Sequence, residues 1–260
     1  MTGNGRDMAL CPVDGIRGRP AAVLLPGTAS TGDFVAATFG PALTAAGYAL
    51  VTGDPPRGPD PLTAWYGQLG AAVRRYRPLL VGGISLGAHL AARWLVENGR
   101  GTVRAADPYG AGIRGLVVAL PGWLGRPGAD TPAAALSRAG ALAVRRDGLA
   151  ATLARTRAHT PGWLGAELVS GWSRYRPDEL VDTLLAAASA AAPDAAGLAR
   201  IRTAAGVVGF VDDPVHPAGI ARDWARLLPH AGHRELPMAA IAADPGRLGT
   251  AALAALADAG

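Results

Sequence analysis

The pentapeptide Gly83–Gly87 (GISLG) constrains the fold of this 260-residue chain more than any other segment. It follows the apolar run Leu79–Val81, which favours a buried strand, and it opens the alanine-rich stretch Leu86–Glu97, which favours a helix. A sharp turn between the two places Ser85 at positive φ, where a Cβ two residues before or after it would collide with the backbone. The two flanking glycines remove that collision. The segment therefore predicts an exposed serine hydroxyl at the carboxyl end of a strand, beside the N-terminus of a helix.

Short apolar runs alternate with helical patterns along the chain. Continuous apolar runs of this length are typical of parallel strands covered on both faces. The sequence therefore predicts an α/β fold with a mostly parallel, twisted sheet and helices on both faces. The expected strands are Ala22–Leu25, Tyr48–Val51, Leu79–Val81, Leu116–Leu120, Val207–Val211 and Arg234–Pro237, after a hairpin of Met8–Val13 and Ile16–Arg19 around Asp14-Gly15. The expected helices are Phe34–Ala46, Pro61–Arg75, Leu86–Glu97 and Pro217–Leu228.

The spacing between the strands at Leu116 and Val207 is unusual, because it holds roughly 90 residues of helical pattern, too many for a simple crossover. We expect an inserted helical cap over residues 121–200, between two parts of the core at 1–120 and 201–260. Its aromatic residues Trp123, Trp163 and Trp172 are weak candidates for the walls of a substrate pocket. The alternative is that they pack the core of the cap itself.

Composition excludes several kinds of chemistry. All 25 basic residues are arginine, so a phosphate-binding loop with its lysine and a Schiff base are both excluded. Cys11 is the single cysteine, which excludes an internal disulfide and a thiolate metal site, and we expect it to pack within a strand. The net charge of +5 comes from scattered arginines that do not alternate with aromatic residues, so no nucleic-acid partner is expected.

The remaining features favour a cytoplasmic enzyme with a small-molecule substrate and neither a cofactor nor a metal. No apolar run approaches the ~20 residues of a membrane span, so no membrane partner is expected. The first seven residues lack the apolar core of a secretion signal. The pair His230 and His233 has a spacing that metal ligands can use, but two ligands alone are a weak signal. The sequence leaves the oligomeric state open.

Four segments together resemble the α/β-hydrolase fold superfamily over nearly the whole chain. Gly83–Gly87 resembles its nucleophile elbow. Leu24–Thr28 resembles its strand and oxyanion loop, with Pro26 where many members have histidine. Thr52–Gly58 resembles the turn after the next strand, and Gly209–Pro217 resembles the late strand and loop that bring the triad acid.

The resemblance implies that Ser85 attacks a carbonyl carbon while backbone N–H groups of Leu86, and of Thr28 or its neighbour, hold the oxyanion. It also implies that Asp213 is the triad acid, with Asp212 as competitor. The expected function is a serine hydrolase that cleaves a small apolar ester or thioester through an acyl-enzyme on Ser85. Two alternatives stay open: a degenerate, non-catalytic member that binds a small ligand, and a non-hydrolytic enzyme of the lyase or cyclase type.

The chain departs from the superfamily in the position of the catalytic histidine. In the superfamily this histidine lies in the loop after the last strand. Residues 238–244 contain none. His216 lies just past the carboxyl end of its expected strand, three residues after Asp213, and could act as a relocated base. The alternative is that it hydrogen-bonds locally and fixes the turn before Pro217.

The other histidines are placed less well for this role. His230 and His233 precede or begin the final strand and should lie at its amino end, away from the site. We expect His89, one helical turn after Ser85, to pack beneath the elbow. Nothing in the sequence places His159 of the expected cap near Ser85.

Overall fold

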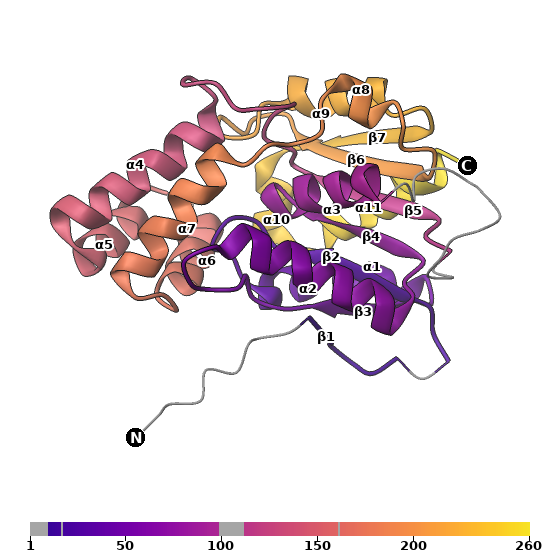
Figure 1. Cartoon of the computed structure of the whole chain (residues 1–260), viewed down its shortest axis with the longest axis horizontal. Helices are drawn as coiled ribbons and strands as arrows, with labels where there is room; N and C mark the ends of the chain where they lie inside the picture. The colour runs from indigo at the N-terminus through magenta and orange to yellow at the C-terminus, as the bar shows by residue number, and fades with distance from the viewer. Residues whose placement is uncertain (1–9, 17, 99–111, 161) are drawn as a thin grey trace.

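The computed structural model describes residues 10–16, 18–98, 112–160 and 162–260, and in this part of the chain seven strands form a single sheet (Figure 1). Their order is β1-β3-β2-β4-β5-β6-β7, and every pair of neighbours is parallel except β1 with β3. The strands are β1 Cys11–Pro12, β2 Ala21–Leu25, β3 Ala49–Thr52, β4 Leu80–Ile84, β5 Gly115–Ala119, β6 Ala204–Phe210 and β7 Ala231–Leu236. The predicted mostly parallel α/β sheet is therefore confirmed.

Helices cover both faces of this sheet and bury a separate core on each (Figure 1). Because side chains alternate along a strand, Val23 of β2 belongs to one core, whereas its neighbour Leu24 belongs to the other. Helices α2 Pro61–Tyr76, α3 Leu86–Glu97 and α9 Ala218–Leu227 pack on one face, and α1 Gly32–Ala45, α10 Met238–Ala243 and α11 Gly246–Ala257 on the other.

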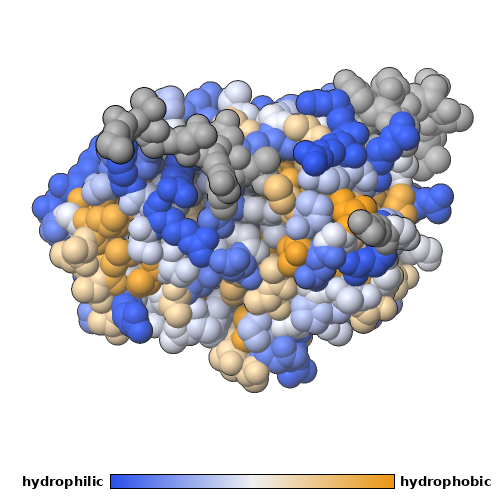
Figure 2. Space-filling view, turned by 90° about the horizontal axis from the view of Figure 1, so that it is seen from below, coloured by the Kyte–Doolittle hydropathy of each residue, from blue (hydrophilic) through white to orange (hydrophobic). Residues whose placement is uncertain are grey.

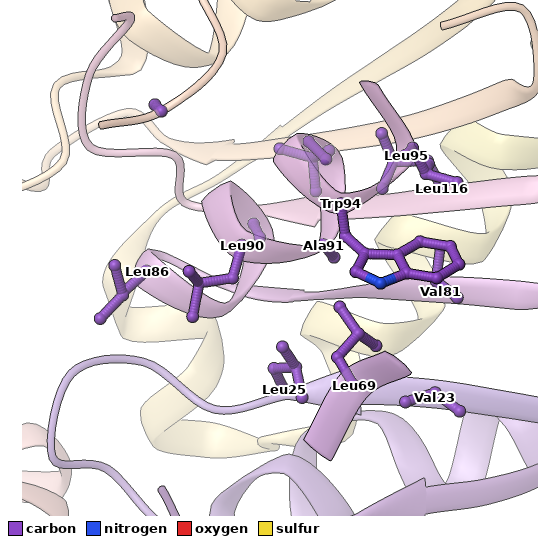
Figure 3. Packing of buried hydrophobic residues seen from close by; sticks show 14 of the residues in the cluster. Val23, Leu25, Leu69, Val81, Leu86, Leu90, Ala91, Trp94, Leu95 and Leu116 are labelled. Carbon is purple, nitrogen blue, oxygen red and sulfur yellow. The ribbon is translucent and has the colours of Figure 1, made fainter. Parts of the chain in front are cut away.

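Helix α3 begins directly after β4, and its packing fixes the turn that joins them. Its Leu86, Leu90 and Trp94 belong to one hydrophobic cluster with residues of β2, β4 and α2, and Trp94 lies beside Val81 of β4 (Figure 3). Trp94 is 5% exposed, and Leu86 is 1% exposed. A helix buried so fully holds its N-terminus, and the residue before it, in one place.

The predicted hairpin at the N-terminal end is wrong. Strand β1 pairs antiparallel with β3, with Cys11 opposite Thr52, and Ile16–Arg19 contributes no strand in its described part. Gly15 and Gly18 both have positive φ, 77° and 72°, and they turn the chain instead. Met8, Ala9 and Arg17 lie outside the described residues. Cys11 is exposed rather than packed, because β1 is an edge strand.

Four helices between β5 and β6 form a layer beside the sheet (Figure 1, left). They are α4 Pro132–Asp147, α5 Leu149–His159, α6 Gly162–Trp172 and α7 Pro177–Ser189, and the short α8 Ala195–Leu198 follows. The layer has its own hydrophobic cluster, which includes Val144, Trp172 and Leu180. These helices fall within the segment 121–200 for which a cap was expected; the cap and the division into residues 1–120, 121–200 and 201–260 remain predictions.

The surface in Figure 2 shows hydrophobic residues in separate groups among hydrophilic ones. Two large apolar side chains of α4, Leu136 and Leu142, are 50% and 62% exposed. Among the described helices, none combines the length and the apolar character that crossing a membrane would require.

Candidate active site

Ser85 occupies the turn between β4 and α3, with φ 50° and ψ −115°. A Cβ on Gly83 would lie 2.3 Å from the carbonyl oxygen of Leu25, and one on Gly87 would lie 2.4 Å from the same oxygen. Since real Cβ atoms do not approach backbone so closely, both positions require glycine. The Ser85 residue itself is partly exposed. The strand, turn and helix predicted from the GISLG segment are present.

The Ser85 hydroxyl contacts the imidazole of His216, which in turn contacts Asp213. Ser85 Oγ lies 2.9 Å from His216 Nε2, and His216 Nδ1 lies 3.0 Å from Asp213 Oδ2. The parallel register aligns the ends of β4, β5 and β6, so the turn after β4 and the loop after β6 meet at one edge of the sheet. The side chain of His216 is 17% exposed, and that of Asp213 is 6% exposed. The structure therefore brings together the three side chains that the sequence proposed.

Asp213 also shapes the loop that carries His216. Its Oδ1 accepts backbone N–H groups of Val215 at 2.7 Å and of His216 at 3.2 Å. Burial alone would raise the pKa of Asp213, but the hydrogen bond and charge of His216 and the two backbone donors outweigh it and hold that pKa below its usual value. An ionised Asp213 can thus orient the imidazole with one oxygen and fix the loop with the other.

Asp212, the competing acid, has a different partner. Its Oδ1 accepts the backbone N–H of Met238 at 2.7 Å, and the residue is exposed. Met238 begins α10, in the segment where the resemblance placed the missing histidine. Asp212 therefore ties the loop after β6 to the start of α10, and Asp213 is the aspartate bonded to His216.

The structure places three other histidines in different surroundings. His233 lies inside β7, with Nε2 3.7 Å from Glu235 Oε1. It is three residues before the end of the strand, or ~10 Å at ~3.3 Å per residue. His230 immediately precedes β7, and His159 is exposed at the end of α5.

His89 is fully buried beneath the elbow, as the sequence predicted. Its Nε2 accepts the backbone N–H of Gly122 at 3.0 Å, and its ring lies between Trp123 and Trp224, with centroids 4.6 and 5.5 Å away. A Cβ on Gly122 would be 3.7 Å from both His89 Cε1 and His216 Cδ2. His89 therefore supports the loop after β5, against which the ring of His216 rests.

The protonation of His89 should make folding stability depend on pH. Burial, with a smaller contribution from the charge of His216, lowers the pKa of His89 from 6.5 to about 3. Between pH 6.5 and 3, only the unfolded chain takes up this proton. The contribution of His89 to the free energy of unfolding is therefore fully present above pH 6.5. It falls as the pH is lowered from 6.5 towards 3, by up to ~1.4 kcal/mol per pH unit. Urea denaturation between pH 7.5 and 4.5 measures this slope.

The variant His89→Gln serves as control, since its amide oxygen can still accept the Gly122 N–H but does not titrate. Burial also lowers the pKa of His233, which acts in the same direction in both proteins. The difference between the two proteins in the slope of unfolding free energy against pH therefore gives the contribution of His89 alone. Equal slopes would contradict the assignment of a buried, neutral imidazole.

The two residues predicted for the oxyanion hole lie on two segments next to Ser85. Leu86 begins α3, whose first N–H groups have no acceptor within the helix and carry its positive potential. Thr28 belongs to the loop after β2, which passes directly beside the elbow, since a Cβ on Gly27 would lie 3.6 Å from Ser85 Cβ. The role of Leu86 and Thr28 stays a prediction.

The three candidate pocket tryptophans have separate positions. Trp123 is buried against His89, and its Nε1 donates to the carbonyl of Ala190. Trp172 is buried in the hydrophobic cluster of the α4–α7 layer, which favours the alternative that it packs the core of that layer. Trp163 of α6 stacks on Phe34 of α1 at 6.0 Å, so it joins the α4–α7 layer to α1.

Sequence reasoning missed the half-buried carboxylate of Glu167 on α6. Its Oε1 accepts hydrogen bonds from Ser30 and Thr31, which follow the predicted oxyanion residue Thr28. The available signal was that Glu167 is the single charged residue of the otherwise apolar segment Gly162–Trp172. A charge in such a segment needs a partner elsewhere in the fold. Among the described residues, no group of three or more histidine, cysteine and acidic side chains could hold a metal ion.

No family model and no curated protein matches the sequence, but many solved structures match the fold. A Mycobacterium tuberculosis H37Rv protein assigned as the non-heme bromoperoxidase BpoC has a TM-score of 0.70 at 20% identity, over 100% of both chains. MenH from S. aureus has a TM-score of 0.66 at 14% identity, over 92% of this chain and 94% of its own. A thermophilic esterase from Thermogutta terrifontis has a TM-score of 0.65 at 16% identity, over 97% and 91%. The chain therefore has the fold of the α/β-hydrolase superfamily.

Proposed function

We propose that this protein is a serine hydrolase that cleaves a small apolar ester or thioester. The observation that carries the proposal is the continuous contact from Ser85 Oγ to His216 Nε2, and from His216 Nδ1 to Asp213 Oδ2, at 2.9 and 3.0 Å. A hydroxyl in hydrogen-bonding reach of an imidazole, itself oriented by a carboxylate, is the arrangement that activates a serine nucleophile.

In the proposed acylation step, His216 Nε2 takes the proton of Ser85 as Oγ forms a bond to the carbonyl carbon. The carbonyl oxygen becomes an oxyanion, to which the N–H groups of Leu86 and Thr28 donate. The ionised Asp213 stabilises the imidazolium. His216 then donates the same proton to the departing alcohol or thiol as its bond to carbon breaks, leaving an acyl group on Ser85.

In the proposed deacylation step, water replaces the leaving group. His216 Nε2 takes a proton from that water as its oxygen bonds to the acyl carbon. Collapse of the second tetrahedral intermediate breaks the bond to Ser85 Oγ, and the proton returns to the serine. The products are a carboxylic acid and the free enzyme.

One loop would supply both the acid and the base of this triad. Asp213 and His216 follow β6 together, and the two backbone hydrogen bonds of Asp213 preorganise the loop. The alternative of a degenerate protein without a base rested on the lack of histidine after the last strand. The contact between His216 and Ser85 supports the catalytic proposal over that alternative.

The preference for an apolar substrate is supported by the aromatic pair of Trp163 and Phe34, which lies between α6 and the start of α1. Helix α1 directly follows the loop of Thr28, and Phe34 lies in its first turn. An esterase and an enol-lactonase are among the structures that share the fold.

A fluorophosphonate probe tests this function, because it forms a covalent bond only with an activated serine. We expect intact-mass analysis to show a single adduct, and peptide mapping to place it on Ser85. The Ser85→Ala variant should stay unlabelled. A folded wild-type protein that resists the probe and cleaves neither p-nitrophenyl butyrate nor an acyl thioester would refute the proposal.

Replacing each aspartate in turn should separate their roles. Asp213→Asn is expected to lower kcat by ~10⁴-fold, since the amide no longer favours the productive imidazole tautomer. Asp212→Asn, which alters the contact with Met238 rather than one with His216, should change kcat by less than about tenfold. Steady-state hydrolysis of p-nitrophenyl butyrate measures both. A larger loss in Asp212→Asn would reverse the assignment.

A further inference from the structure

A carboxylate from the helical layer is bonded to the loop that carries the proposed oxyanion donor. Glu167 of α6 accepts the hydroxyl of Ser30 at 2.6 Å, the backbone N–H of Thr31 at 2.9 Å and the hydroxyl of Thr31 at 3.0 Å. All three bonds end on Oε1. Because an ionised carboxylate only accepts, both hydroxyl protons must point towards it, which fixes their orientation.

These bonds extend into the start of α1. While the Thr31 hydroxyl donates to Glu167, its oxygen accepts the backbone N–H of Phe34 at 3.0 Å and so caps the helix. Thr31 is 1% exposed, so these contacts are sheltered from water. The loop of residues 27–31, here called the oxyanion loop, thus ends in a network that Glu167 completes.

Packing joins α6 to the same loop independently of these bonds. Ala29 has φ 50°, an unfavourable conformation for a residue with a Cβ, and it is fully buried in the hydrophobic cluster of the α4–α7 layer. A Cβ on Gly171 would lie 2.0 Å from the carbonyl oxygen of Ala29. The strained loop is therefore held by the helical layer rather than by the sheet alone.

Charges at the edge of this contact reinforce it. Arg174, just after α6, donates to Asp54 at 2.7 Å and to Asp33 at 2.9 Å. The other oxygen of Asp54 accepts the backbone N–H of Gly32 at 2.9 Å, directly after the oxyanion loop. Burial raises the pKa of Glu167, against the opposing effects of Ser30, Thr31 and Arg174. The positive charge of Arg174 thus favours the ionised form of Glu167.

We propose that Glu167 is a positioning residue that holds the oxyanion loop in the geometry from which the Thr28 N–H faces the oxyanion. This inference rests on the proposed serine hydrolase. If so, the oxyanion hole takes its proposed geometry only when the helical layer is packed against the oxyanion loop. Removal of Glu167 should release the loop without affecting Ser85, His216 or Asp213, which lie on other segments.

The first test compares Glu167→Ala and Glu167→Gln with wild type in the hydrolysis of p-nitrophenyl butyrate. Since the loss of one oxyanion donor costs 10²–10³-fold, we expect Glu167→Ala to lower kcat by ~10- to 100-fold, with KM within about threefold. Glu167→Gln retains a weaker acceptor and should lose only ~3- to 10-fold. The matched control is Glu179→Gln, a layer glutamate bonded to Arg176 instead, and it should retain wild-type kcat.

The second test, amide hydrogen exchange of a peptide spanning residues 27–34, requires no activity. We expect this peptide to exchange at least about tenfold faster in Glu167→Ala than in wild type, and unchanged in Glu179→Gln. If wild type proves inactive and unlabelled, the proposed hydrolase fails, while exchange still shows whether Glu167 holds the loop.

Wild-type kcat together with wild-type exchange in Glu167→Ala would overturn the inference, even with Ser85 fully labelled. If Glu167→Ala does not fold, Glu167→Gln decides by the same two measurements. Unchanged values for both would then overturn the inference, and a parallel loss of kcat and protection would support it.

Discussion

Replacing Ser85 with alanine is expected to lower kcat for p-nitrophenyl butyrate by ~10⁴- to 10⁶-fold, because the acyl-enzyme can no longer form. Stability should change little, since the residue is partly exposed and, among the described residues, the hydroxyl bonds to His216 alone. Residual hydrolysis would come from the oxyanion hole and from substrate binding alone. Initial rates over a range of substrate concentrations measure the loss.

The matched control for Ser85→Ala is Ser189→Ala. The Ser189 hydroxyl donates to backbone carbonyls at the end of α7 and is exposed. It should retain wild-type kcat and KM. Substantial activity in a Ser85→Ala protein purified without contaminating esterase would contradict the proposed nucleophile.

The second large effect is expected for His216→Ala. Without the imidazole, Ser85 has no group to take its proton, and the leaving group has none to donate one, so kcat should fall by ~10⁴- to 10⁶-fold. The effects on kcat of replacing residues that act together in one step do not add. The double variant with Ser85→Ala should therefore be no slower than either single variant within about threefold.

His233→Ala is the matched control for this histidine, because His233 stands in the strand after which the superfamily's base would follow. It lies inside β7 beside Glu235 rather than at the end of the strand. It should retain kcat within about threefold. Loss of activity in His233→Ala, with full activity in His216→Ala, would mean that the base had been assigned to the wrong residue.

Much of the core could be predicted from sequence because its signals are local. The apolar runs of β2, β4 and β6 bury both faces of each strand, and this pattern survives in any parallel sheet. The elbow is local too, since the two glycines are required by contacts within one turn. Predicted ends of helices were close to those observed, and α3 spans the expected residues 86–97.

What the sequence could not decide, or predicted wrongly, depended on contacts between distant segments. The hairpin at Asp14-Gly15 did not form because β1 pairs with β3 instead. The choice between Asp212 and Asp213 depended on which carboxylate faced His216 and which faced Met238. Glu167 could not be assigned a role because its partners Ser30 and Thr31 lie far away in sequence.

His216 shows both what the sequence could predict and what it could not. Sequence placed it at the correct edge of the sheet, because it follows β6 and parallel strands share that edge. Whether its ring faced Ser85 or only fixed its own loop depended on side-chain direction. The structure shows contacts with Ser85 and Asp213 together, and the backbone bond from His216 to Asp213 accompanies them.

The central claim, that His216 activates Ser85, is tested most directly by the rate constant at which a fluorophosphonate modifies Ser85. Intact-mass spectrometry at pH 7.5 would follow wild type, His216→Ala and His233→Ala side by side. The account predicts that modification slows at least ~10³-fold in His216→Ala and stays within about threefold in His233→Ala. Modification of His216→Ala at the wild-type rate would contradict it.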